Sequence, residues 1–264
     1  MRLEKLTIGY DNRVVQENLS LQIKSGEMVC VLGKNGCGKS TLLRTLSGLQ
    51  PALSGCCIMP DGRKVSELSE REKACSMAIV LTERLSASNT TVEDVVAMGR
   101  FPYTGWLGSL SNKDRNIIDK ALSQTEMTEK RYAFFNKLSD GEKQRVLISK
   151  ALAQETPYIF LDEPTAHLDL PNRIKTLLLL RELAHKANKA VVISTHELDL
   201  AIQTADIIWL MKPQAGIVVG TPESLVENGD FQRTFEDSHF SLIQIDGALK
   251  IRLHTSGTPV EAGS

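Results

Sequence analysis

The stretch MVCVLGKNGCGKSTLLRTLSG, residues 28–48, decides which fold the sequence predicts. Its first five residues, 28–32, form an uninterrupted apolar run, which is typical of a strand buried on both faces. A glycine-rich loop follows, and a helical pattern over residues 39–47 stops at Gly48. A strand, a loop and a helix in this order predict an α/β fold around a mainly parallel sheet.

The loop between this strand and this helix fits the phosphate-binding pattern G-x-x-x-x-G-K-[ST]. Its glycines let the backbone wrap around phosphates with N–H groups pointing inward, and the helix adds its positive end. Lys39 is expected to reach the β- and γ-phosphates, and the Ser40 hydroxyl to hold Mg²⁺. A chance match is on the order of one in a hundred, so a glycine-rich turn without a ligand is the minority alternative. We expect a nucleotide to contact Gly33, Lys34, Asn35, Gly36, Cys37, Gly38, Lys39, Ser40 and Thr41.

Two adjacent carboxylates end a second buried strand. The apolar residues 158–161 lead directly into Asp162 and Glu163. Alone, such a pair would more often be a helix cap or a solvated turn. In a parallel sheet, however, this strand end and the phosphate-binding loop lie at the same edge. We therefore expect Asp162 to bind Mg²⁺ indirectly, and Glu163 to orient or deprotonate the attacking water.

A histidine follows a further strand end. His196 lies between the apolar run 190–194 and the helix-like residues 197–204. A single histidine in such a place is usually a capping or packed residue. Because it follows a strand of the same predicted sheet, we expect it to donate a hydrogen bond to the γ-phosphate.

Composition and charge exclude several classes of protein. The 264 residues include 31 Lys and Arg against 32 Asp and Glu, so the charge balance does not indicate a nucleic-acid partner. The apolar runs are about six residues long, short of the roughly 20 that a membrane-spanning helix needs. The first residues lack the pattern of a secretory signal. The five cysteines lack zinc spacing, and we expect reduced thiols of a cytosolic protein rather than zinc or disulfides.

The remaining patterns predict one large domain with an insertion. Residues 3–8 and 20–24 are strand-like, and buried-strand patterns recur at residues 77–81 and 207–211. From about residue 83 to 154 the pattern is helical, with expected helices over residues 91–99, 111–123 and 140–153. We expect a domain over residues 1–235 that contains this helical insertion, and C-terminal strands with a flexible tail over residues 236–264.

One further segment resembles a known family. Residues 138–145, LSDGEKQR, lie shortly before Asp162 and resemble the signature motif of ABC ATPases, usually Leu-Ser-Gly-Gly-Gln. The phosphate-binding loop, the acidic strand end and His196 follow the order of that family. The resemblance extends roughly from Leu3 to Phe235.

The resemblance implies a P-loop NTPase core with an N-terminal antiparallel β part, and ATP hydrolysis with Mg²⁺ by a head-to-tail homodimer. Each ATP would lie between the phosphate-binding loop of one copy and the signature segment of the other. It implies that Tyr10 stacks on adenine, and that Asp169 belongs to a loop, residues 166–169, that crosses the dimer interface. Ser139 and Gly141, at a helix N-terminus, would meet the partner's γ-phosphate. Hydrolysis would remove that bridge and open the dimer.

Three positions depart from the family's pattern. Asp140 stands where Gly is usual, and Glu142 where Gln is usual. We expect weaker ATP-driven dimerisation because like charges repel at short range; the alternative is that both side chains face solvent and favour the helix N-terminus. The Gln that ends the strand at residues 77–81 is replaced by Thr82-Glu83. A Thr82 hydroxyl is a conceivable metal ligand, but it lacks the donor and acceptor of an amide.

The aromatic stretch GRFPYTGW, residues 99–106, resembles the ATPases that serve importers of iron-siderophore complexes, haem and vitamin B12. GTPE, residues 220–223, is also common among importer ATPases. These resemblances imply a position on the inner face of the cell membrane and permease subunits that grip the helical insertion. An extracytoplasmic substrate-binding protein would be an indirect partner, and nucleic acid none. The alternative for the aromatic stretch is a packed loop.

Three other functions are less consistent with the sequence. An ABC-type ATPase of DNA repair would need long coiled coils between Lys39 and Asp162, where there is no room for them. A GTPase would show Asn-Lys-x-Asp, whereas residues 188–191 read NKAV. A regulatory ATP-binding protein with weak hydrolysis remains open. The altered signature favours it, and Glu163 and His196 argue against it.

Overall fold

The computed structural model describes residues 1–11, 13–81, 89–105, 108–212, 216–235, 240–245 and 248–253. Three expectations lie outside these residues: the metal ligand Thr82, the aromatic Trp106 and the flexible tail at residues 255–264. Among the described helices, none is both long enough and apolar enough to cross a membrane.

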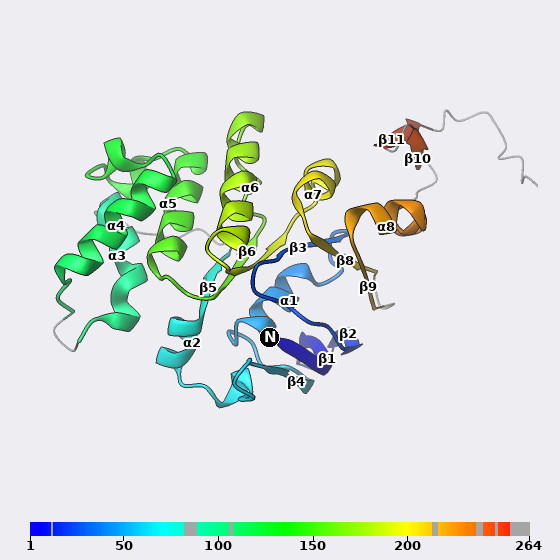
Figure 1. Cartoon of the computed structure of the whole chain (residues 1–264), viewed down its shortest axis with the longest axis horizontal. Helices are drawn as coiled ribbons and strands as arrows, with labels where there is room; N and C mark the ends of the chain where they lie inside the picture. The colour runs from blue at the N-terminus through cyan, green and yellow to red at the C-terminus, as the bar shows by residue number, and fades with distance from the viewer. Residues whose placement is uncertain are drawn as a thin grey trace, which may run out of the picture.

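A six-stranded sheet forms the centre of the chain (Figure 1). Its strands follow the order β5-β6-β7-β3-β8-β9, and all neighbouring pairs are parallel except β8 and β9. The apolar runs predicted as buried strands coincide with β3 and β5 to β8 to within one residue at each end. The α/β fold with a mainly parallel sheet is therefore confirmed. The strands are β3 (Met28–Gly33), β5 (Met77–Val80), β6 (Tyr158–Asp162), β7 (Ala190–Ser194), β8 (Ile207–Met211) and β9 (Ile217–Gly220).

Alternate residues of these strands pack into two cores, one on each face of the sheet. From β3, Met28, Cys30 and Leu32 join one core, whereas Val29 and Val31 join the other. Side chains point to opposite faces with a period of two, so a strand covered on both faces needs an apolar residue at every position. This requirement explains the uninterrupted apolar runs in the sequence.

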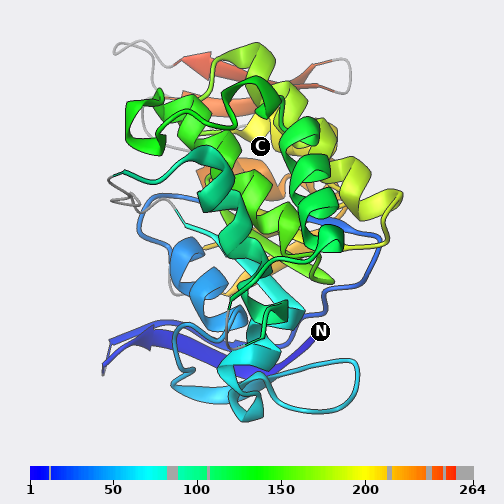
Figure 2. The same cartoon turned by 90° about the vertical axis from the view of Figure 1, so that its left-hand side faces the viewer.

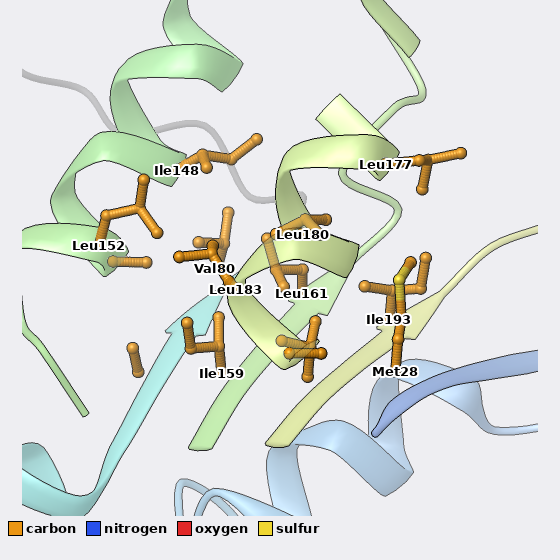
Figure 3. Packing of buried hydrophobic residues seen from close by; sticks show 14 of the residues in the cluster. Met28, Val80, Ile148, Leu152, Ile159, Leu161, Leu177, Leu180, Leu183 and Ile193 are labelled. Atoms are coloured by element: carbon orange, nitrogen blue, oxygen red, sulfur yellow. The ribbon is translucent and has the colours of Figure 1, made fainter. Parts of the chain in front are cut away.

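Helices cover the first of these faces. Figure 3 shows Leu180 and Leu183 of α6 beside Ile159 and Leu161 of β6, and Ile193 of β7 belongs to the same core. Three further helices, α3 to α5, pack against one another and gather at one end of the sheet, away from the N-terminal strands (Figures 1 and 2). The helices on this side are α3 (Val92–Ala97), α4 (Asn112–Gln124), α5 (Asp140–Ala153), α6 (Leu170–His185), α7 (Leu198–Thr204), α8 (Pro222–Glu227) and α9 (Asp230–Phe235).

Capping boxes fix where the helices at that end begin. Ser111 accepts a hydrogen bond from the backbone of Asp114, which bonds back to the backbone of Ser111, so the predicted cap of α4 is confirmed. Thr91 starts α3 and Ser139 starts α5 in the same way. The predicted helix over residues 91–99 ends at Ala97, earlier than expected, because the chain continues from there as a 3₁₀ helix (Met98–Tyr103).

The second face carries α1 (Lys39–Leu46) and a separate antiparallel sheet with the strand order β2-β1-β4. Its strands are β1 (Arg2–Tyr10), β2 (Arg13–Leu19) and β4 (Ser54–Ile58). The strand predicted over residues 20–24 was wrong: β2 lies before it, and residues 20–24 keep only an isolated bridge from Gln22 to Arg2. Inside β2, Asn18 has a φ of +55°, and the pairing of β2 with β1 is irregular near this residue. Helix α2 (Glu70–Ser76) and the hairpin of β10 (Phe240–Ile245) and β11 (Ala248–Leu253) complete the described strands and α-helices.

Candidate nucleotide site

A cavity of about 680 Å³ opens at the edge of the central sheet where β3 and β6 end. Most of its lining comes from the predicted phosphate-binding loop, and Tyr10 and Glu163 face it from either side. Three lining residues, Arg13, Val14 and Val15, were not anticipated, because they come from the misplaced strand β2. The residues that line the cavity are Tyr10, Arg13, Val14, Val15, Asn35, Gly36, Cys37, Gly38, Lys39, Ser40, Thr41 and Glu163.

Glycines let the loop close tightly around this cavity. A Cβ added at Gly33 would lie 2.6 Å from Cys37 Sγ and 2.7 Å from the carbonyl oxygen of Met211. Gly38 has a φ of +104°, and a Cβ there would lie 2.3 Å from Val15 Cγ1. A Cβ on Gly36, in contrast, would meet nothing within 4 Å. The loop is therefore packed against protein at its two ends and open in its middle, as a phosphate cradle requires.

The phosphate-binding loop holds the side chain of its own Lys39 in place. The Lys39 side chain is buried, and its Nζ donates to the carbonyl oxygen of Gly33 at 2.9 Å. On the other side, the Thr41 hydroxyl donates to the Tyr10 hydroxyl at 3.0 Å, while Tyr10 stays 49% exposed. Burial raises the pKa of the Cys37 thiol, which keeps this side chain neutral beside the cavity. The cavity thus has a positive charge fixed at Lys39 and an accessible aromatic ring at Tyr10.

A buried glutamine, Gln16, supports the loop on the side of the Cys37 carbonyl group, and the sequence did not predict this role. Gln16 Nε2 donates to the carbonyl oxygens of Cys37, at 3.3 Å, and of Lys212, at 2.6 Å. Its Oε1 accepts from the backbone N–H of Gly216 at 3.2 Å. A polar side chain buried with three backbone partners fixes the geometry of the segments that it joins. No local pattern marks Gln16, because its partners lie far away in the sequence.

The predicted acidic and histidine residues meet at the neighbouring strand ends. Asp162 is only 2% exposed and accepts a hydrogen bond from the Ser194 hydroxyl. The same hydroxyl and the Ser194 carbonyl both accept from the backbone N–H of Glu163, each at 3.1 Å. His196 Nδ1 lies 3.5 Å from Glu163 Oε1, and the imidazole is 56% exposed. Ser194 is a second residue that sequence reasoning missed.

The backbone at Glu163 is strained. Its φ is +48°, in the left-handed region that residues with a side chain rarely adopt. Such a conformation costs on the order of 1–3 kcal/mol and persists only when its surroundings enforce it. Here the two hydrogen bonds to Ser194 do so, and they aim the carboxylate of Glu163 into the cavity.

The oxygen donors for a magnesium ion are present at this edge. Ser40 lines the cavity, and Asp162 ends β6, which pairs with β7 beside β3. Mg²⁺ prefers oxygen ligands, and it is commonly held by one or two protein groups together with water and substrate phosphates. The donor set therefore fits a phosphate-bound Mg²⁺.

The signature-like segment lies elsewhere. Helix α5 begins at Asp140 as predicted, with Ser139 as its N-cap. The described residues that line the cavity do not include Ser139, Asp140 or Gly141. Gly141 instead packs against the loop at residues 166–169: a Cβ on it would lie 3.2 Å from Leu168 Cδ2 and 3.3 Å from the His167 carbonyl oxygen. At the end of that loop, Asp169 accepts from the backbone N–H of Asn172 and caps α6.

The two acidic departures in this segment differ from one another. Glu142 accepts from the backbone N–H of Ser139 at 3.0 Å and forms an ion pair with Lys130. The Lys130 hydrogen bond and then the Ser139 N–H lower the pKa of Glu142. Asp140 is more exposed, and its carboxylate lies 3.4 Å from Lys143 Nζ. Glu142 therefore neither faces solvent freely nor carries an uncompensated charge. Asp140 is exposed, which is consistent both with repulsion of a nearby phosphate and with a side chain that simply faces solvent.

Comparison with known proteins gives a family match and close relatives. The family model described as ABC transporter matches residues 16–166. A petrobactin import ATP-binding protein of Bacillus anthracis is 36% identical over 227 residues, which are 86% of this chain and 83% of the relative.

Two solved structures are similar in fold and sequence. An inward-facing transporter described as a metal-chelate type ABC transporter has a TM-score of 0.76 and 28% identity, and the match covers 96% of both chains. A dimeric ATP-binding cassette in a post-hydrolysis state, bound to ADP and Pi, has a TM-score of 0.74 and 28% identity, and the match covers 84% of this chain and 98% of the other.

Proposed function

This chain belongs to the ABC transporter family as an ATPase that couples ATP hydrolysis to transport, and from that premise we propose that it powers an importer of iron chelates of the siderophore type. The cavity between the phosphate-binding loop and Glu163 is the observation that carries the enzymatic part of the proposal. The importer and its cargo class are supported by the relative that serves petrobactin import and by the metal-chelate type transporter.

The residues of the cavity have separate roles in this proposal. Lys39 and the backbone N–H groups of the loop bind the phosphates, and the exposed ring of Tyr10 stacks on the adenine. Ser40 would hold Mg²⁺ directly and Asp162 would bind it indirectly, and the bound ion would neutralise phosphate charge. The Glu163 carboxylate orients the attacking water and accepts its proton, while His196 donates a hydrogen bond toward the γ-phosphate.

Two copies of the chain form the complete site in this proposal. ABC ATPases dimerise and associate with permease subunits, and the dimeric cassette with ADP and Pi belongs to this fold. Ser139 and Gly141 are not among the described residues that line the cavity of their own chain, and Gly141 packs against the loop that holds Asp169. We infer that this face meets the nucleotide of the partner copy, head to tail.

The 3₁₀ helix after α3 supports the placement of a permease. Phe101 is 59% exposed at this position, and Tyr103 is partly exposed. The neighbouring Arg100 is buried, with its guanidinium carbon 4.2 Å from the centre of the Tyr103 ring and its Nε 2.8 Å from Asp114 Oδ1. An aromatic surface anchored on a buried ion pair suits a membrane-protein partner. The chain would then lie on the cytoplasmic face of the membrane, with a substrate-binding protein on the other side as an indirect partner.

ATP hydrolysis by the purified chain, measured against protein concentration, tests the proposal. Wild-type activity should rise more steeply than linearly, because two copies form one site. Glu163→Gln should lower kcat at least 100-fold, since it removes the base but keeps the size of the side chain. The same variant should form a dimer with ATP on size exclusion.

Glu182→Gln is the matched control, because Glu182 is an exposed carboxylate on α6 that pairs only with Lys186 among the described residues. It should leave kcat unchanged. Wild-type chain that binds ATP and dimerises without turnover, also when its permease is co-expressed, would contradict the proposal in favour of a regulatory ATP-binding protein.

A further inference from the structure

A buried carboxylate beside His196 has no role in the site described above. Glu197 follows His196 directly, and its side chain is only 11% exposed. Its Oε1 accepts from the Thr165 hydroxyl and lies close to Arg173 Nη1, both at 3.2 Å. Its Oε2 is buried and has no hydrogen-bond partner among the described residues. Burying a carboxylate without pairing it costs free energy, and among the described residues Arg173 is the cation that pairs with Glu197.

Arg173 joins this carboxylate to the loop at residues 166–169. Its Nε donates to the carbonyl oxygen of Leu168 at 2.7 Å, while Nη1 pairs with Glu197. Two separate donors of one planar guanidinium therefore hold two segments of the chain in a fixed relation. Leu168 in turn lies against Gly141 of the signature-like segment.

The same contacts also connect the two segments that carry Glu163 and His196. Thr165 is two residues beyond Glu163 and is only 2% exposed. His196, next to Glu197, lies against Glu163 through its Nδ1. The segments that carry Glu163 and His196 are thus linked twice, once directly and once through Thr165 and Glu197.

We propose that Glu197 and Arg173 are positioning residues for ATP hydrolysis, which hold the interface loop at residues 166–169 in register with His196. The inference rests on the proposed function, because it assigns these two side chains to the same site. The pair transmits the position of the loop, where Leu168 meets Gly141, to the strand end that carries His196. Neither side chain touches the nucleotide.

The arrangement predicts an effect on turnover rather than on binding. Glu197, Arg173 and Thr165 are absent from the described lining of the nucleotide cavity. Their loss leaves the phosphate-binding loop and its support by Gln16 intact. It frees the interface loop and the backbone of His196, which act when two copies meet around the nucleotide.

Three variants test the inference: Arg173→Met, Glu197→Gln and the double variant. Each single change should lower kcat about tenfold and keep the KM for ATP within about twofold. The double variant should also fall only about tenfold, because both changes break one link and their effects are not additive. Lys186→Met, at the C-cap of the same helix, is the matched control, since it removes an exposed pair with Glu182, and it should leave kcat unchanged.

The melting temperature of each variant separates positioning from simple destabilisation. Glu197→Gln is nearly isosteric and keeps an acceptor for Thr165, so it serves as the test even where Arg173→Met folds poorly. Full wild-type kcat in Glu197→Gln, an equal loss of kcat and ATP affinity, or additive losses in the double variant would each overturn the inference. Absence of turnover in the wild-type chain would overturn the proposed function first, whereas an active wild type with unaffected variants would overturn the inference alone.

Discussion

The phosphate-binding loop and the signature-like segment of α5 are the two regions that the family resemblance assigns to one nucleotide, yet they are built differently. The loop is packed into its own chain. The buried Lys39 donates to the carbonyl oxygen of Gly33, and Gln16 donates to the carbonyl oxygen of Cys37. The segment that starts at Ser139 lies at the surface, and its polar groups bond to residues of its own helix or to Lys130. In the proposed dimer, one half of the site would therefore be preorganised within a single chain, while the other half would need the partner copy.

Lys39→Ala should give the largest effect, because it removes a buried cation that is held on the carbonyl oxygen of Gly33 beside the cavity. Charge-assisted hydrogen bonds to phosphate are among the strongest in proteins, and we expect ATP affinity to fall about 100-fold, or about 2.7 kcal/mol. Isothermal titration calorimetry with ATP measures this loss. Lys34→Ala, at an exposed position of the same loop, is the control and should cost less than about fivefold. Equal losses in both variants would show that net charge, not the buried geometry of Lys39, provides the affinity.

Gly38→Ala and Gly36→Ala test whether the loop is preorganised by packing. Both glycines have positive φ, so either change should cost about 1 kcal/mol of the free energy of unfolding. Gly38 also meets Val15 Cγ1, and valine cannot easily turn away, so Gly38→Ala should cost about 2–3 kcal/mol in all. Urea unfolding of the two variants compares them directly. Losses of the same size would mean that the contact with Val15 yields freely and that the loop is less rigid than we infer.

The parts of this comparison that the sequence predicted are those with a local pattern. The buried strands have uninterrupted apolar runs, and α4 and α5 have an N-cap three residues before an acidic partner. The ends of β3, β6 and β7 were correctly placed, so the phosphate-binding loop, Glu163 and the segment of His196 were expected at one edge, where the structure has them.

The parts that the sequence did not predict depend on contacts between distant residues. Gln16 reaches Lys212, and Ser194 reaches Asp162, yet nothing near either residue in the sequence marks it. The position of β2 along the chain was missed for a related reason. Alternating apolar residues continue past Leu19, and no side-chain pattern records where the pairing of β2 with β1 stops.

Asp140→Gly and Glu142→Gln sharpen the comparison at the signature-like segment. Both carboxylates have a lysine partner, but the Glu142 side chain is 17% exposed beside Lys130, whereas the Asp140 side chain is 51% exposed beside Lys143 at the first turn of the helix. We therefore expect Asp140→Gly to strengthen ATP-dependent dimerisation about threefold, or about 0.7 kcal/mol, through weaker repulsion of the partner's phosphates. Glu142→Gln should change it less than twofold. Analytical ultracentrifugation with ATP, in the Glu163→Gln background, provides the measurement, and a larger effect of Glu142→Gln would show that its pairing opens in the dimer.

Glu142 should also give the smallest effect, a dependence of stability on pH. Its pKa lies below the ordinary value near 4.3, first because of Lys130 and then because of the Ser139 N–H. A depressed folded-state pKa stabilises the protein above the ordinary pKa, and this contribution is lost as the pH falls through the lowered value. Because the pair with Lys130 is partly exposed, we expect only about 0.5 kcal/mol. Urea unfolding at pH 7 and pH 3 should therefore show Glu142→Gln less stable than wild type at pH 7 and nearly equal at pH 3. A difference that persists unchanged at pH 3 would mean that the size and hydrogen bonds of the side chain, rather than its charge, hold the start of α5, and that this half of the site is as firmly built as the loop.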